Sequence, residues 1–121
     1  MQHIGVDIIE ITRIEEAVTN WGERFLSRIY TEAELKLCRR NPAPLAARFA
    51  SKEAVMKLLG TGVKGVSWKE IETLSHPSGK PLVNLYGGAK VEAEKLGIKG
   101  IAVSLSHSKE YAIAMVTGET E

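Results

Sequence analysis

Two apolar segments near the end of the chain, 101–107 and 111–117, are separated by only three residues. A connection this short joins antiparallel strands, because parallel strands need a crossover of about a dozen residues or more. Both faces of the two segments carry apolar or small residues, which is typical of strands that are covered on both sides. The sequence therefore predicts a central, covered hairpin, and with it an antiparallel sheet.

Helices and further strands precede this hairpin. Helical periodicity and capping patterns predict helices at 13–21, 23–29, 31–40, 45–59 and 87–96. Alternating apolar residues predict strands at 3–11, 66–75 and 82–86, of which the last two form a hairpin-like pair. Thr12 and Thr31 each stand three residues before a glutamate, a capping-box pattern at a helix start. The order of elements predicts an α+β fold with helices packed on one antiparallel sheet.

Length and composition fit a single globular domain spanning residues 1–121. A chain of 121 residues can bury one core but not two ordinary ones. The net charge of +1 provides no global attraction to nucleic acid or membrane, and no apolar run approaches the roughly 20 residues of a membrane span. The arrangement of aromatic and basic residues gives no pattern that argues for stacking on bases. We therefore expect a soluble protein with neither kind of partner.

Cys38 is the only cysteine. A disulfide within the chain is excluded, which fits a reducing compartment, and the absence of a signal-peptide pattern adds to the prediction of a cytoplasmic protein. No histidine stands near Cys38 in the sequence to activate its thiol. We interpret Cys38 as a structural thiol rather than a nucleophile.

The first predicted strand contains an aspartate, Asp7, among apolar neighbours. Alternation places Asp7 on the same side as Gly5 and Ile9, with Val6 and Ile8 on the other side. Aspartate is uncommon in strands, and a buried carboxylate is costly unless a cation or hydrogen-bond donors compensate it. Asp7 is therefore predicted to have such a partner, or to face water at an edge.

The longest predicted helix, 45–59, has a lysine inside its apolar stripe. Lys52 lies one turn from both Phe49 and Met56. In one interpretation its stem packs on the apolar face while the ammonium reaches water. In the other, the ammonium lies in a desolvated cleft, where it would meet phosphate or a developing negative charge. The position alone favours the first interpretation.

Glu53 and Lys57 lie one turn apart on the same helix. They could form a surface ion pair worth about 0.2–0.5 kcal/mol. Alternatively, the row presents a carboxylate to a metal and an ammonium to a phosphate. Asp7 and Glu53 together would suit Mg²⁺, which usually takes one or two carboxylates, keeps several waters and binds substrate phosphates.

The same helix carries Arg48 one turn before Lys52, and Gly60 and Gly62 follow its end. Cations and glycines in this order make a plausible phosphate environment, in which Gly60 would border the bound group. The glycines alone also serve simply to end a helix. The pattern is not a P-loop, because the helix precedes the glycines instead of following them.

Further polar residues have two interpretations each. His107 ends a predicted strand at a turn, where it is either a surface residue or a contact to a phosphate or leaving group. Arg13, Arg24 and Arg28 are interleaved with glutamates, which is typical of a solvated surface. The alternative is a local basic patch that receives an acidic protein.

Two motifs taken together resemble those of the holo-acyl-carrier-protein synthases, the small trimeric group of the phosphopantetheinyl transferase superfamily. The first is Ile4-Gly-Val-Asp7-Ile, and the second is Arg48-Phe-Ala-Ser-Lys-Glu-Ala54 with the lysine at 57. The likeness covers nearly the whole chain and includes the closing segments Ser104-Leu-Ser-His107 and Tyr111-Ala-Ile-Ala-Met115.

The resemblance implies transfer of phosphopantetheine from coenzyme A to a serine of apo acyl carrier protein, with release of adenosine 3′,5′-bisphosphate. By matching positions, it implies that Asp7 and Glu53 hold Mg²⁺ against the coenzyme A pyrophosphate. It also implies that Lys52 and Lys57 lie at the phosphates. Asp7, Glu53 and Lys52 would then be the catalytic residues.

The resemblance has further consequences for the partners. Arg48 and His107 are implied to contact the 3′-phosphate of the nucleotide. The basic patch of Arg13, Arg24 and Arg28 would dock the acidic carrier protein and raise its association rate. The family is homotrimeric with each site between neighbouring subunits, so one chain alone would not complete the pocket around Asp7.

Several alternatives stay open. The base that takes the serine proton could be Glu53, Asp7 acting through water, or hydroxide on the metal. A Mg²⁺-dependent phosphohydrolase could use the same carboxylates on a nucleotide. A module that binds coenzyme A or a nucleotide without catalysis would need them only as structural groups.

Overall fold

The computed structural model describes residues 1–60 and 65–120. It confirms the α+β prediction. The elements in chain order are β1 (Gln2–Glu10), α1 (Ile11–Trp21), α2 (Glu23–Ile29), α3 (Glu32–Cys38), α4 (Pro42–Leu59), the short 3₁₀ turn η1 (Trp68–Glu70), β2 (Ile71–Ser75), β3 (Pro81–Leu85), α5 (Gly87–Leu96), β4 (Ile101–His107) and β5 (Tyr111–Glu119). In the described part of the chain, no helix is both long and apolar enough to cross a bilayer.

The start of α1 differs from the prediction. The helix begins at Ile11 directly after β1, and Thr12 is not its cap. The backbone N–H of Ile11 donates to the carbonyl of Glu110 at 2.8 Å. The turn of the β4–β5 hairpin thus satisfies a donor at the helix start that a side-chain cap would otherwise serve. The predicted capping box at Thr31 is confirmed, with Glu34 as its partner.

Two other boundaries also differ for local reasons. Helix α4 begins at Pro42, earlier than predicted, because Asn41 accepts a hydrogen bond from the next turn and proline suits the first helical position. Residues 66–70 do not extend β2, because Ser67 and Glu70 form a reciprocal cap around η1. Strand β2 therefore covers only the second half of the predicted strand.

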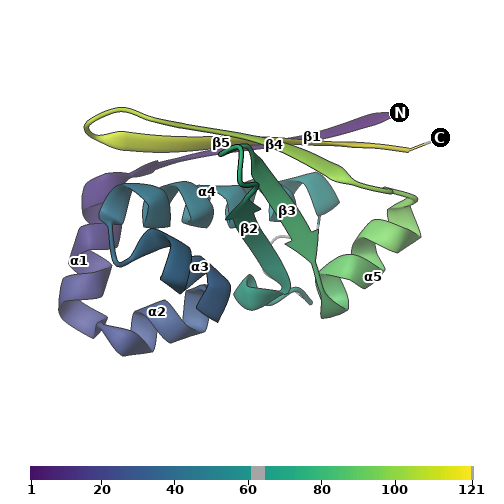
Figure 1. Cartoon of the computed structure of the whole chain (residues 1–121). Coiled ribbons are helices and arrows are strands. Elements are labelled where there is room, and N and C mark those ends of the chain that lie inside the picture. Colours follow the sequence, from purple (N-terminus) through teal and green to yellow (C-terminus); the bar gives the residue numbers. More distant parts are fainter. Residues whose placement is uncertain (61–64, 121) are drawn as a thin grey trace.

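The strands form two antiparallel sheets. The larger one has the order β1-β5-β4, and the smaller one pairs β2 with β3. In Figure 1 the three-stranded sheet lies along one side of the molecule, with α4 against its inner face. The smaller sheet stands beside α4, and α5 follows it. Strand β5 is thus central, whereas β4 is an edge of its sheet.

The outer face of the three-stranded sheet is not covered, so the prediction of a hairpin covered on both sides is wrong for a single chain. Ile4, Val6 and Ile8 of β1 are 64%, 49% and 60% exposed. Met115 of β5 is 45% exposed and pairs with Val6, while Ile113 pairs with Ile8. Apolar side chains therefore form a continuous outward row across β1 and β5.

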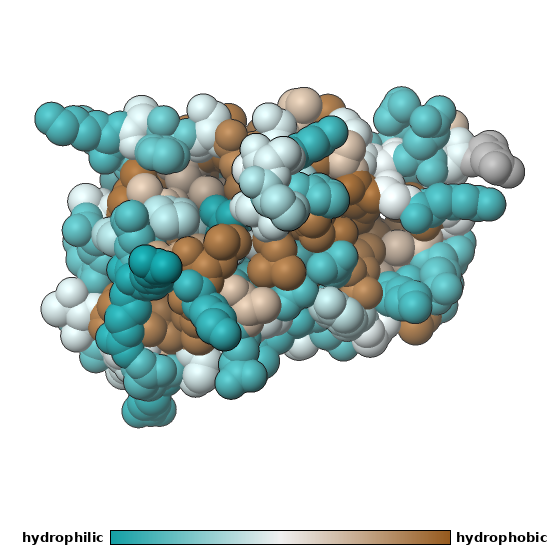
Figure 2. Space-filling model, viewed as in Figure 1, coloured by the Kyte–Doolittle hydropathy of each residue, from teal (hydrophilic) through white to brown (hydrophobic). Residues whose placement is uncertain are grey.

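The face of the molecule that is seen in Figures 1 and 2 has a different pattern. In the orientation of Figure 2, hydrophobic residues gather in the middle of the face, over α4 and β3. Hydrophilic side chains project around this area. The core itself lies between α4 and the inner face of the sheet, where Ala50, Ala54, Ala112, Ala114 and Val116 have no exposed surface.

Gly5 sets the distance between α4 and β1. A Cβ atom at Gly5 would lie 2.0 Å from the carbonyl oxygen of Ala54 and 3.1 Å from the backbone nitrogen of Leu58. Both neighbours are backbone atoms of α4, which cannot rotate away as a side chain can. The glycine therefore lets the helix backbone lie directly on the strand.

We expect Gly5→Ala to destabilise the protein, because α4 must move away from β1. Overpacking of a well-packed core typically costs about 1–3 kcal/mol, and sometimes more. Urea unfolding followed by circular dichroism would measure the loss. Gly100→Ala is the matched control, since nothing lies within 4 Å of a Cβ atom there. Equal unfolding midpoints for the two variants would contradict this account of Gly5.

Candidate functional site

Helix α4 carries its charged residues on two faces. Arg48 and Lys52 lie about 40° apart around the axis, and so do Glu53 and Lys57. The two rows are separated by about 140°. The first row faces β2 and α3, and the second faces β1. The cations and the carboxylate that are close in sequence therefore do not form one cluster.

Asp7 has the cationic partner that the sequence predicts. The Nζ atom of Lys57 lies 3.1 Å from Oδ1 of Asp7 and donates to the carbonyl of Val6 at 3.0 Å. The Asp7 side chain is 15% exposed, whereas that of Lys57 is 55% exposed. The carboxylate is thus mostly enclosed, while the lysine reaches it from the solvent side.

Glu53 lies close to the same pair. Burial and the negative charge of Asp7 raise the pKa of Glu53, while Lys57 and Arg13 act in the opposite direction. The charge of Asp7 acts on the ionisation of Glu53, so the two carboxylates lie in one electrostatic neighbourhood. The structure therefore brings together Asp7, Glu53 and Lys57 at the contact of β1 with α4.

Arg13 also belongs to this neighbourhood. It lies in the first turn of α1, which follows β1 without a loop. Its guanidinium is exposed and close enough to Glu53 to lower the pKa of that carboxyl group. Arg24 and Arg28 are exposed on α2, one turn apart and on a different helix from Arg13.

The residues at the contact of β1 with α4 fit a magnesium ion. Carboxylate oxygens are hard ligands, and one or two of them commonly hold Mg²⁺ together with waters and phosphate oxygens. Asp7 and Glu53 supply that number, and Lys57 already shows that a positive charge is favourable against Asp7. Among residues 1–60 and 65–120, no group of three acidic, histidine or cysteine side chains offers a fuller set of ligands.

Both interpretations of Lys52 are wrong. Its side chain has no exposed surface, so the ammonium reaches neither water nor an open cleft. The ammonium lies 2.7 Å from Oε1 of Glu34 and donates to the carbonyls of Trp68, at 3.1 Å, and Ile71. It also lies 5.8 Å from the centre of the Tyr30 ring. Lys52 therefore holds α4, α3 and the start of β2 together.

Glu34 is the buried partner that the sequence analysis missed. Burial lowers the pKa of Lys52, and the charge of Glu34 opposes that shift. Glu34 also accepts hydrogen bonds from the backbone N–H groups of Thr31 and Thr73, each at 2.9 Å. A capping-box glutamate beside a buried lysine is thus fully paired. One oddity in the sequence, a lysine in an apolar stripe, could have indicated that a buried carboxylate pairs with it.

Arg48 belongs to the same face of α4. Its side chain is buried, and its guanidinium donates to the carbonyl of Thr73 at 3.3 Å and to the hydroxyl of Ser75 at 3.1 Å. The hydroxyl groups of Ser51 and Thr73 lie 2.8 Å apart beside it. Arg48 therefore anchors β2, and the structure does not bring it to Asp7 and Glu53.

A second acidic residue missed by the sequence analysis is Glu72. It accepts hydrogen bonds from the hydroxyls of Thr31 and Tyr86 at 2.6 and 3.0 Å, and from the amide of Asn84 at 3.4 Å. Burial opposes ionisation, but these hydrogen bonds outweigh it and lower the pKa of Glu72. The carboxylate links α3 to the smaller sheet.

The remaining predicted residues lie apart from the carboxylates. Gly60 ends α4 in the left-handed conformation with φ 76°, three residues after Lys57. Gly62 lies outside the described residues. His107 is exposed at the end of β4, which is separated from β1 by β5. Because adjacent strands are about 4.8 Å apart, His107 and Asp7 of one chain are roughly 10 Å or more apart.

Cys38 is a buried thiol, as predicted. Burial raises its pKa to about 11. The reactive form of cysteine is the thiolate, which is scarce at neutral pH when the pKa is this high. Cys38 thus does not act as a nucleophile.

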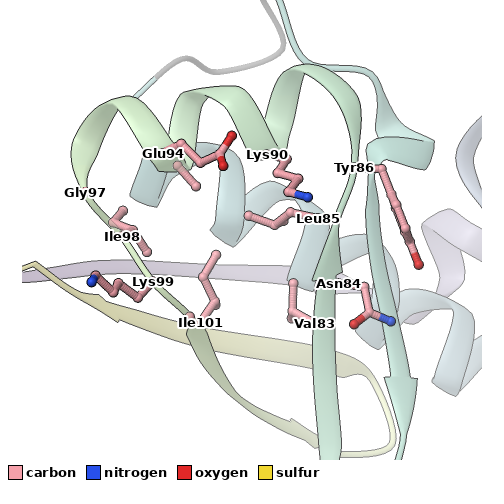
Figure 3. Close-up of a pocket in the computed structure, with 12 residues that line it drawn as sticks. Val83, Asn84, Leu85, Tyr86, Lys90, Glu94, Gly97, Ile98, Lys99 and Ile101 are labelled. Atoms are coloured by element: carbon pink, nitrogen blue, oxygen red, sulfur yellow. The ribbon is translucent and has the colours of Figure 1, made fainter.

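A hollow of about 600 Å³ lies between β3, α5 and the start of β4. Figure 3 shows Val83, Leu85 and Ile101 along its apolar side, with Lys90 and Glu94 of α5 at its border. None of the residues predicted for the site lines this hollow.

Comparison with known proteins gives a consistent result. Residues 3–116 match the model of the 4′-phosphopantetheinyl transferase superfamily. A holo-[acyl-carrier-protein] synthase of Dehalococcoides mccartyi is 58% identical over 119 residues, covering 98% of this chain and 99% of the relative. The corresponding protein of Herpetosiphon aurantiacus is 51% identical over 121 residues, covering 94% and 95%.

Solved structures agree with this. The holo-[acyl-carrier-protein] synthase of Helicobacter pylori in complex with coenzyme A superposes with a TM-score of 0.88 at 34% identity, covering 96% of this chain and 99% of that one. The Bacillus anthracis protein, in complex with coenzyme A (3′,5′-ADP), has a TM-score of 0.80 at 36% identity, with coverage of 98% and 96%. The chain therefore belongs to the holo-[acyl-carrier-protein] synthases of the 4′-phosphopantetheinyl transferase superfamily.

Proposed function

We propose that this chain transfers 4′-phosphopantetheine from coenzyme A to a serine of apo acyl carrier protein. The observation that carries the proposal is the meeting of two carboxylates with an exposed lysine where α4 lies on β1. Family membership supports it, as does the coenzyme A complex of the Helicobacter pylori relative. Transfer would take place in the cytoplasm, where a lone cysteine stays reduced.

The reaction exchanges the phosphoanhydride bond of the pyrophosphate for a phosphodiester bond to serine. The serine oxygen of the carrier attacks the phosphorus that bears pantetheine, and the bond from that phosphorus to the bridging pyrophosphate oxygen breaks. Adenosine 3′,5′-bisphosphate leaves with the bonding electrons, and the serine proton passes to a base. Such a transfer depends on in-line positioning and on neutralising charge more than on covalent help from the protein.

Each site residue has a separate task in this proposal. Asp7 and Glu53 would hold Mg²⁺, which neutralises pyrophosphate charge when it is bound. Lys57, whose side chain is 55% exposed, would bind a phosphate oxygen. Gly60, just after it, leaves the backbone free of a side chain on that side. Lys52 acts only by fixing α4, since its ammonium is fully enclosed.

The carrier protein would dock beside this place. Arg24 and Arg28 form an exposed basic row on α2. Arg13 on α1 is a third exposed cation, and its charge acts on the pKa of Glu53. Arg13 would thus connect the basic row to the carboxylates. An acidic partner approaching this row would be attracted at long range and oriented toward the carboxylates.

We also propose a homotrimer with sites shared between subunits. The uncovered apolar row of β1 and β5 supports an association of copies, because contiguous exposed apolar surface is uncommon on monomers. The separation of His107 from Asp7 within one chain supports sharing, since a neighbour could supply the histidine. The guanidinium of Arg48 already donates two hydrogen bonds to β2. A contact between Arg48 and a phosphate would therefore use one of its remaining N–H groups.

The transfer assay tests the central proposal. Incubation with coenzyme A, Mg²⁺ and apo carrier protein should add one phosphopantetheine to the carrier, as measured by intact mass. We expect Glu53→Ala to abolish this addition while the far-ultraviolet circular dichroism stays unchanged. An unmodified carrier would contradict the transferase. Phosphate released without a carrier would favour a hydrolase, and coenzyme A binding unaffected by Asp7→Ala and EDTA would favour a passive module.

Arg24→Glu should raise the KM for carrier protein at least severalfold, because reversing a charge at the edge of an interface mainly slows association. The KM for coenzyme A should not change. Lys95→Glu, on α5, makes the same change of net charge and serves as the control. If both variants raise the carrier KM equally, the row on α2 is not a docking surface.

Met115→Lys should convert the trimer into monomers, because it places a charge in the apolar row of β1 and β5. Met115 already faces outward in the single chain, so the fold should persist. Light scattering after size exclusion would give the mass of each species. Thr19→Lys, at an exposed position of α1, controls for the added charge. A wild-type monomer, or a Met115→Lys trimer, would refute the proposed interface.

A further inference from the structure

Lys57 occupies the place that a cation would take against Asp7. Its ammonium lies 3.1 Å from the Asp7 carboxylate and 3.0 Å from the carbonyl of Val6. A carboxylate oxygen and a backbone carbonyl oxygen are both ordinary ligands of hard metal ions. The lysine therefore uses oxygens that a divalent cation would also seek.

The pairing has a plain electrostatic reason. Asp7 is largely enclosed at the contact of β1 with α4, and Glu53 adds a second negative charge nearby. Without a compensating cation, two carboxylates in one neighbourhood repel each other. The ammonium of Lys57 removes much of that repulsion and so stabilises the site before any metal arrives.

The same lysine is also free to leave. Its side chain is 55% exposed, and its four-carbon stem can swing without disturbing α4. Only the lysine of this ion pair is open to water, but that exposure screens the attraction, so a doubly charged cation on Asp7 can displace the ammonium. The proposed function needs Lys57 at a phosphate, but two of the three ammonium donors are directed to Val6 and Asp7, so release from these partners would make all three available.

We propose that Lys57 is an exchangeable placeholder for the divalent cation. In the metal-free protein its ammonium neutralises Asp7, and binding of the cation by Asp7 and Glu53 releases the ammonium toward the phosphates of coenzyme A. This inference rests on the proposed function for the identity of the phosphate ligand. Lys57 would thus compete with the metal and assist the nucleotide.

Direct metal binding tests the exchange. Mn²⁺ serves as the probe, and the signal of free Mn²⁺ in electron paramagnetic resonance gives its affinity for the purified full-length protein. Lys57→Met should bind Mn²⁺ about fivefold more tightly or better, because both the competing ion pair and the repulsion between like charges are removed. Calorimetry should show that the same variant binds coenzyme A less tightly, at least severalfold.

Two controls separate this effect from others. Lys95→Met removes an equal charge from α5 and should leave Mn²⁺ binding unchanged. Lys57→Arg keeps the charge and should bind Mn²⁺ no more tightly than the wild type. Circular dichroism checks that every variant is folded. A merely structural role for Lys57 would weaken both ligands, whereas the placeholder predicts changes in opposite directions.

The outcomes are distinct. Unchanged or weaker Mn²⁺ binding by Lys57→Met would overturn the placeholder, and so would equal tightening by Lys95→Met. If the wild type, Asp7→Asn and Glu53→Gln all bind Mn²⁺ alike, the carboxylates are not the metal site, and that part of the proposed function fails together with the placeholder. If the wild type transfers phosphopantetheine but Lys57→Met binds Mn²⁺ with unchanged affinity, the placeholder role is refuted and the proposed function stands.

Discussion

The contact between the backbones of α4 and β1 at Gly5 is the constraint on which the candidate site depends. A glycine on the strand and alanines on the helix let the two elements approach until only backbone atoms separate them. Asp7 lies two residues further along the same face of β1, so it meets the helix row that carries Glu53 and Lys57. A wider spacing would leave an aspartate without its cation. Packing and electrostatics are therefore parts of one arrangement.

Helix α4 divides two kinds of work between its faces. Lys52 and Arg48 face inward and bond to Glu34 and to β2. Glu53 and Lys57, rotated by about 140°, face the strand and the solvent. The inward row is enclosed by protein, and its bonds fix the position and rotation of the helix relative to α3 and β2. The outward row then presents its charges in a defined direction, which the proposed binding of a pyrophosphate would require. Under the proposed function, adjacent positions in the sequence serve stability and chemistry separately.

Much of this could be predicted from the sequence, and the failures have physical causes. Helices and strands follow from local periodicity, and the compensation of Asp7 follows from the cost of burying a charge. The burial of Lys52 could not be predicted, because its partner Glu34 is distant in sequence. Each residue also had its own local explanation, Lys52 as a side chain that reaches water and Glu34 as a capping-box partner. The hairpin was expected to be covered because periodicity shows which residues are apolar, but not what covers them. Arg48 resembled a phosphate ligand because a motif reports residue types and not the face that each one occupies.

The enclosed pair of Lys52 and Glu34 also restricts how the sequence can change over time. Loss of either partner leaves an isolated charge in the core, which is strongly destabilising, whereas replacing both by apolar residues of similar volume is often tolerated. Glu34 in addition caps α3 and receives the N–H of Thr73, so an apolar replacement there would leave two further donors unpaired. The two positions are therefore expected to be inherited together, and drift at one of them is blocked while the other stays unchanged. Lys52 stands next to Glu53, so a residue with no access to substrate can be as restricted in its substitutions as the neighbour that is proposed to hold the metal.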